Sequence, residues 1–188
     1  MYRVEVCLKS HLPDARGQGL VKDIRDLGIT AVTDVRVMDI YWLDADLSTK
    51  ELDLICRCLL ADPVTQDYQF FVPPFDFKGE VNRQSRTIEV AYNAGVVDPV
   101  EDSVLKAIRD MGLSSVRAVK TSKRYVIEGQ LDERRLDVIS SRLLVNPIIQ
   151  HIVGPEQFGF LENPQYEFVL EEVDILAPGD VLRQRFGF

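Results

Sequence analysis

The chain has 188 residues, 46% hydrophobic and 28% charged, and a formal net charge of −8 at pH 7. This composition is typical of a globular protein, and the acidic excess argues against nucleic acids and anionic membranes as partners. Without a run of about 18 apolar residues or a disulfide-type cysteine spacing, the sequence predicts a cytoplasmic protein with no membrane contact.

The chain begins with a predicted strand followed by a predicted helix. Residues 2–9 alternate between apolar and polar side chains, which is the pattern of a half-buried strand. Asp14 can cap a helix that ends at Gly28, because glycine readily adopts the left-handed conformation found after a helix. The inward stripe of this helix is predicted to be Leu20, Val21, Ile24 and Leu27.

A stretch rich in β-forming residues follows at 32–46. Its apolar alternation changes phase near Met38, which predicts a bulge or a tight turn and favours two strands joined by a hairpin over one bent strand. A second helix begins at the capping box of Ser48 and stops before Pro63. A last strand is predicted at 64–72.

The same order of elements returns 84 residues later. Residues 4–66 align with 88–150 without a gap, and 19 of the 63 pairs are identical. Identical pairs include Glu5/Glu89, Asp14/Asp98, Ile24/Ile108, Tyr41/Tyr125, Pro63/Pro147 and Gln66/Gln150. We therefore expect an α+β fold, a two-layer sandwich of tandem β-α-β-β-α-β repeats packed as a pseudo-two-fold pair.

The repeats define the predicted domain organisation. The first repeat covers 1–72, a linker rich in proline and polar residues covers 73–87, and the second repeat covers 88–154. The tail at 155–188 belongs to neither repeat, and its residues 166–175 resemble a strand.

The residues suggest no catalytic or metal site. The glycines of 16–19 lack the lysine and hydroxyl residue of a phosphate-binding loop. His11 and His151 occupy non-equivalent positions in the two copies, which argues against a shared site. Cys56 and Cys58 are two residues apart on a helix, so their side chains point in different directions. Intrinsic catalysis is therefore the weaker hypothesis.

Two pairs of polar residues recur at equivalent positions. Asp14 and Asp98 either cap helices only or also shape a loop that faces a partner. Tyr41 and Tyr125 either pack in the core or make a contact between the two copies. Both alternatives stay open at this point.

An ordered set of short motifs resembles a known family. The first copy reads Val4-Glu5-Val6-Cys7-Leu8-Lys9, Asp14-Ala15-Arg16-Gly17, Leu27-Gly28, Asp34-Val35-Arg36-Val37, Tyr41 and Leu59-Leu60-Ala61-Asp62-Pro63-Val64. This set resembles PurS, the small subunit of phosphoribosylformylglycinamidine synthase. The second copy keeps Asp98-Pro99, but Glu101 replaces the glycine and residues 118–121 replace the Asp-Val-Arg-Val run.

The resemblance implies a non-catalytic role in de novo purine (IMP) biosynthesis. Such subunits bridge the ATP-dependent synthetase (PurL-like) and the glutaminase (PurQ-like) for ammonia transfer. ATP, Mg and glutamine would be used by the assembled complex, with no cofactor in this chain. Long fused synthetases have an N-terminal domain similar to a PurS dimer made from one chain, so 155–188 would lead toward a synthetase if this chain belongs to such a fusion.

The resemblance also gives candidate interface residues but no catalytic ones. The candidates are Asp14, Gly17, Arg36, Tyr41, Asp98, Pro99 and Tyr125. An alternative function is a small-molecule-binding regulatory module built from two βαββαβ units, and a standalone enzyme is a third.

Overall fold

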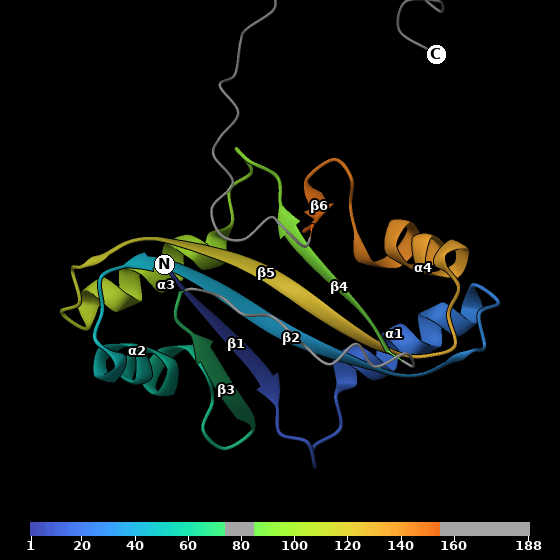
Figure 1. Ribbon diagram of the computed structural model, residues 1–188, viewed down its shortest axis with the longest axis horizontal. Helices are drawn as coiled ribbons and strands as arrows, with labels where there is room; N and C mark the ends of the chain where they lie inside the picture. The colour runs from blue at the N-terminus through green and yellow to red at the C-terminus, as the bar shows by residue number, and fades with distance from the viewer. Residues whose placement is uncertain (74–84, 155–188) are drawn as a thin grey trace, which may run out of the picture.

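A computed structural model describes residues 1–73 and 85–154 (Figure 1). The elements in chain order are β1 (Tyr2–Leu8), α1 (Ala15–Asp26), β2 (Val32–Ala45), α2 (Thr49–Ile55), η1 (Cys56–Leu60), β3 (Gln66–Phe71), β4 (Ser85–Tyr92), α3 (Pro99–Asp110), β5 (Val116–Gly129), α4 (Glu133–Ile139), η2 (Ser140–Leu144) and β6 (Gln150–Ile152). β4 begins within the stretch that the sequence predicted as a linker. The strand predicted at 166–175 lies outside the described residues.

All the strands listed above form one antiparallel sheet in the order β3-β1-β2-β5-β4-β6. β2 and β5 are the two central strands, and each carries the remaining strands of its own repeat on its outer side. The repeats are therefore halves of a single sheet. The α+β class and the pseudo-two-fold packing of the two repeats are confirmed.

Residues 32–45 form one continuous strand instead of the hairpin that the sequence favoured. β2 pairs with β5 from Val32 to Ala45 and takes the place of both middle strands of the predicted unit. The apolar phase changes because both faces of the strand are buried near its centre. Val37 is 3% exposed on the face that carries the helices, and Ile40 is 0% exposed on the other face.

The register of β2 and β5 places the pseudo-two-fold axis at one residue pair. Asp39 lies opposite Lys123, which is its equivalent 84 residues later. The same shift converts the neighbouring pair Met38–Arg124 into the pair Ser122–Ile40, which lies on the other side of Asp39 and Lys123. The sequence repeat is thus reproduced as a two-fold arrangement of the sheet.

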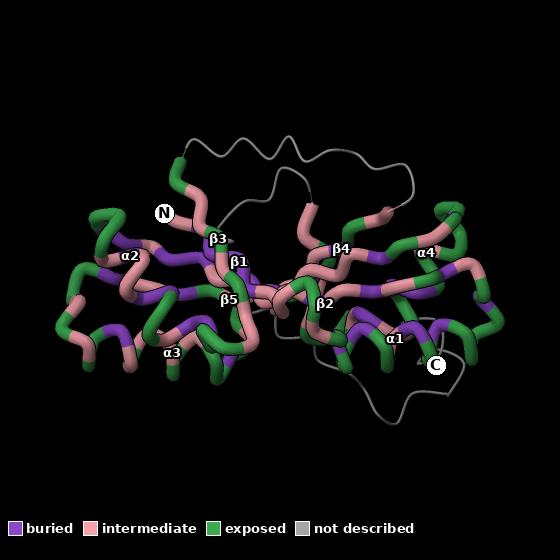
Figure 2. The backbone as a smooth tube through the Cα atoms, turned by 90° about the horizontal axis from the view of Figure 1, so that it is seen from below, coloured by how far each residue is buried: buried purple, intermediate pink, exposed green. Residues whose placement is uncertain are grey.

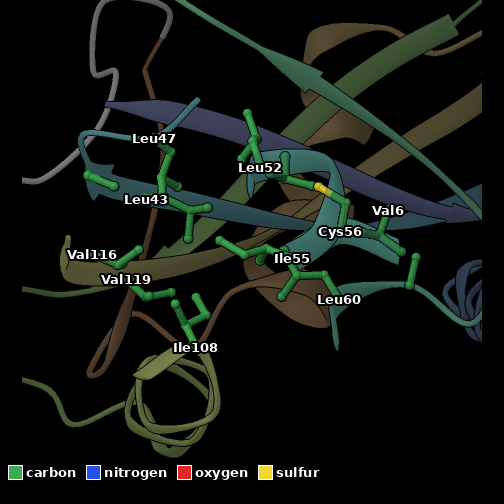
Figure 3. Packing of buried hydrophobic residues seen from close by; sticks show 13 residues of the cluster. Val6, Leu43, Leu47, Leu52, Ile55, Cys56, Leu60, Ile108, Val116 and Val119 are labelled. Atoms are coloured by element: carbon green, nitrogen blue, oxygen red, sulfur yellow. The ribbon is translucent and has the colours of Figure 1, made fainter. Parts of the chain in front are cut away.

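The helices pack in two groups at opposite ends of the sheet, α2 with α3 and α1 with α4 (Figures 1 and 2). Each group encloses a hydrophobic core that mixes the two repeats. The first core contains Leu52 and Ile55 of α2 together with Ile108 of α3, which points toward the first-repeat residues in Figure 3. The second contains Ile24 of α1 with Ile127 and Ile139 of the second repeat. Neither repeat encloses a complete core alone.

The local signals for helix ends are confirmed. Ser48 and Glu51 form a capping box, and the Asp14 and Asp98 side chains cap α1 and α3. Gly28 follows α1 with a φ of 81°. Leu27 was predicted to face inward but is 41% exposed, because it is the C-cap residue at the point where the chain leaves α1.

Truncation of Ile24 or Ile108, the helix residues that pack against the opposite repeat, should destabilise the whole chain. Ile24 and Ile108 are both 0% exposed, so we expect Ile24→Ala and Ile108→Ala each to lower the free energy of unfolding by about 2–5 kcal/mol. Urea unfolding should show one cooperative transition at a lower midpoint. Leu27→Ala is the control, with an expected change of roughly 0.5 kcal/mol or less. Two separated transitions would contradict the mixed cores.

Candidate partner-binding site

Asp14 joins the start of α1 to the central strand β2. Its Oδ1 accepts hydrogen bonds from the backbone N–H groups of Arg16 at 3.0 Å and Gly17 at 3.1 Å. Its Oδ2 accepts one from the N–H of Val37 at 2.8 Å. β1 pairs with β2 only as far as Asp39, so the Asp14 carboxylate supplies the acceptor that β1 no longer provides.

Asp98 joins the start of α3 to β5 in the second repeat, but through different partners. Its carboxylate accepts from the N–H of Val100 at 2.8 Å and from the hydroxyl of Thr121. Glu101, the equivalent of Gly17, lies 2.8 Å from Lys120 Nζ. Burial raises the pKa of Glu101 above its ordinary value, although the hydrogen bond from Lys120 opposes this. The second copy thus anchors its helix with an ion pair where the first copy has a glycine.

An ion pair lies at the pseudo-two-fold axis on the helix-bearing face. Arg16 Nη1 donates to both carboxylate oxygens of Asp39, at 2.9 and 3.0 Å, and Nη2 donates to the carbonyl of Val37 at 3.2 Å. Tyr41 and Tyr125 lie half-buried on the same face, and burial raises the pKa of both phenols. We call Arg16, Asp39, Tyr41 and Tyr125 the axial strip.

The opposite face of the sheet carries a buried network of four charges. Arg3 binds Glu5 through Nε at 2.8 Å and holds Glu89 with two hydrogen bonds of 3.1 and 2.7 Å. Arg124 lies 2.8 Å from Glu5 and 3.4 Å from Glu89. The Arg3 guanidinium also stacks 4.7 Å from the centre of the Trp42 ring. The network therefore spans β1, β5 and β4.

This network is well shielded from solvent and electrically balanced. The side chains of Arg3, Glu5 and Glu89 are 1%, 8% and 10% exposed, and that of Arg124 is 24% exposed. Burial alone would raise the pKa of Glu89, but hydrogen bonds from Arg3 and Ser122 and the charge of Arg124 hold it below its ordinary value. Loss of one member leaves a buried charge without its counter-charge, which is costly.

The structure brings some of the predicted interface residues together and separates others. Asp14, Tyr41, Asp98 and Tyr125 gather on the helix-bearing face near the axis. Arg36 lies on the opposite face, where it donates to the carbonyl of Ser10 at 3.3 Å. Pro99 is exposed at the start of α3. Gly17 is buried against β2.

The buried network was missed by reasoning from the sequence. The polar positions of residues 2–9 were predicted to face solvent, although Arg3 and Glu5 are buried. The identity of Glu5 and Glu89 between copies was visible but gave no partner. Arg3 has Thr87 as its equivalent and Arg124 has Ile40, so comparison of the repeats could not reveal the arginines.

Residues 1–73 and 85–154 contain no group of three or more His, Cys, Asp or Glu side chains that could hold a metal ion. No helix within the same ranges is long and apolar enough to cross a membrane.

Comparison with known proteins places the chain in a family. The model of the PurS family, described as phosphoribosylformylglycinamidine (FGAM) synthase, matches residues 1–73 and 85–153. The chain belongs to the PurS family. The two matched segments correspond to the two repeats, so this is a PurS chain with two units.

A crystal structure of Bacillus subtilis PurS in a C2 crystal form is similar to part of the chain. It is 27% identical, the match covers 38% of this chain and 96% of that chain, and the TM-score is 0.35. No curated protein matches the sequence.

Gly17 tolerates no side chain, because a Cβ there would lie 1.7 Å from the carbonyl oxygen of Val35. We expect Gly17→Ala to lower the free energy of unfolding by about 3 kcal/mol by forcing α1 away from β2. Gly19 in the same helix has nothing within 4 Å of its Cβ position, so Gly19→Ala should stabilise by roughly 0.5–1 kcal/mol. Urea unfolding of both variants measures this. Similar effects of the two substitutions would contradict the close approach.

Glu89→Gln should cost about 3 kcal/mol at pH 7, because it leaves two arginines with one carboxylate. The folded-state pKa of Glu89 is lowered, so its stabilisation is present above the unfolded pKa of about 4.3 and disappears as the pH falls through the folded value. The difference between wild type and variant should therefore shrink below about pH 4 in urea unfolding. Glu133→Gln, at a side chain that is 79% exposed, is the control. A difference independent of pH would contradict the assignment.

Proposed function

We propose that this chain is a non-catalytic PurS-like subunit or domain of phosphoribosylformylglycinamidine synthase. In this role it bridges the ATP-dependent synthetase and the glutaminase for ammonia transfer in de novo purine synthesis. ATP, Mg and glutamine are used by the assembled complex, which works in the cytoplasm. The family match supports the identity of the complex, and two equivalent turns, at 62–66 and 146–150, support the binding role.

Two turns at opposite edges of the sheet are built in the same way. In the first, the N–H of Asp62 donates to Gln66 Oε1 at 2.8 Å and the N–H of Val64 donates to Asp62 Oδ1 at 2.9 Å. In the second, the N–H of Asn146 donates to Gln150 Oε1 at 3.0 Å. Ile148 completes the second turn through its N–H, 3.1 Å from Asn146 Oδ1. These bonds explain why a glutamine recurs four residues after Asp62 and Asn146 in the two repeats.

Each turn is also held by the residue after the neighbouring strand. Lys9 donates from Nζ to the carbonyl of Pro63 at 2.6 Å, and its backbone N–H donates to Thr65 at 3.0 Å. Asn93, the equivalent of Lys9, bonds the carbonyls of Ile148 and Ile149. The turns are therefore fixed by side-chain and backbone bonds on both sides.

These fixed turns present branched apolar side chains to solvent. Val64 is 75% exposed and Ile148 is 83% exposed. An apolar side chain on a preorganised turn can enter an apolar pocket of a partner with little loss of conformational entropy. The recurrence of this feature at equivalent positions of two repeats is the observation that carries the proposal, because the core does not require it.

The interface residues inferred from the sequence fit the proposal in two ways. Pro99 and Arg36 are accessible for direct contact. Asp14 and Asp98 are buried and set the position of α1 and α3. Tyr41 and Tyr125 are half-buried in the axial strip, so part of each ring remains accessible to a partner segment.

Val64→Glu and Ile148→Glu should each weaken assembly with at least one of the two large subunits by tenfold or more, because a carboxylate would be buried in an apolar contact. The assay is co-purification of the full chain with the purified synthetase and glutaminase in the presence of ADP and glutamine. Val97→Glu is the matched control, since Val97 is 77% exposed but lies outside both turns. It should assemble as wild type does.

Failure of the wild-type chain to bind either subunit would contradict the bridging role. A thermal shift with amino acids or nucleotides in that case would support the alternative, a small-molecule-binding regulatory module. Equal loss with all three variants would contradict a specific role for the turns.

A further inference from the structure

The two central strands carry charges of opposite sign. β2 contains three aspartates (Asp34, Asp39, Asp44) and one arginine, a net charge of −2. β5 contains four basic residues (Arg117, Lys120, Lys123, Arg124) and one glutamate, a net charge of +3. These strands are equivalent in the repeat and pair with each other along their length. The divergence between the copies has therefore given the two paired strands net charges of opposite sign, although Asp34 lies opposite Glu128.

We propose that this junction selects a complementary half and rejects a second copy of the same half. Two first repeats paired in the same register would bring together strands with charges of −2 each, with Asp39 opposite Asp39 on the axis. Two second repeats would pair strands of +3 each, with Lys123 opposite Lys123. Like charges directly opposite each other destabilise a strand pair. One repeat of each kind is the favoured combination.

The ion pairs that cross the junction also depend on arginines that are present in only one of the two repeats. Arg3 binds Glu89 at 2.7 Å, Arg124 binds Glu5 at 2.8 Å, and Arg117 Nε binds Asp44 at 2.9 Å. Each of these pairs joins one repeat to the other. The residues equivalent to the three arginines are Thr87, Ile40 and Thr33, which carry no charge. Pairing of either repeat with itself would thus lose at least one of these basic partners.

The mixed cores add a consequence for assembly. Each core is built from one helix of the first repeat and one helix of the second. The charges that select the partner strand therefore also select which helix completes the core. A second copy of this chain, or a subunit made of one self-pairing repeat, is therefore a poor substitute for the covalently linked half.

Charge reversal in the full chain tests the proposal. Arg117→Glu with Lys123→Glu changes β5 to −1, and Asp39→Lys with Asp44→Lys changes β2 to +2. We expect each double variant to lower the melting temperature by roughly 4–8 °C. The fourfold variant restores opposite signs and should recover at least half of that loss. Arg57→Glu with Arg142→Glu, at exposed positions of η1 and η2, is the control and should change the melting temperature little.

The recovery should weaken in 1 M NaCl, because salt screens exposed charges. An equimolar mixture of the two double variants, refolded together, should also give a mixed dimer of twice the mass, since complementary strands then lie on different chains. Losses that simply add in the fourfold variant, or a mixture that stays monomeric, would overturn the proposal.

Discussion

The antiparallel pairing of β2 with β5 is the constraint on which the rest of the structure depends. It joins two three-stranded halves into one sheet and sets the axis at Asp39 and Lys123. Because the central strands are 14 residues long, each extends beyond its own repeat and forms part of the floor of the other core. The first helix of each repeat can then pack across the junction, so the two cores are coupled through the same strands.

Polar interactions reinforce this coupling on both faces of the sheet. On the helix-bearing face, Asp14 and Arg16 tie α1 to β2 beside the axis. On the other face, Glu5 and Glu89 are equivalent residues that share two arginines from non-equivalent positions. The network therefore holds two acidic and two basic side chains, but only the acidic ones are related by the repeat. Such a body can present two related but different ends, which suits a chain proposed to contact two different proteins.

The sequence revealed the repeat, the helix caps and the fold class, because each depends on local patterns or on self-similarity. It misled at residues 32–45, where burial of both strand faces imitates the phase change of a hairpin. It also missed Arg3, since a polar residue in an alternating strand usually faces solvent and its more distant counter-charge, Glu89, lies 86 positions away in the chain. Gly17 was noticed through the family motif, but only its position against β2, where an added Cβ would lie 1.7 Å from the Val35 carbonyl oxygen, explains its role in this chain.

Native-state hydrogen exchange tests the central claim most directly, namely that the β2–β5 junction makes both repeats one cooperative unit. The slowest amides of β2 and β5 should exchange with the same free energy, equal to that of global unfolding, and amides of α1 and α3 should share this limit in their buried turns. Exchange of one repeat through an opening of lower free energy, with the other repeat still fully protected, would contradict the account.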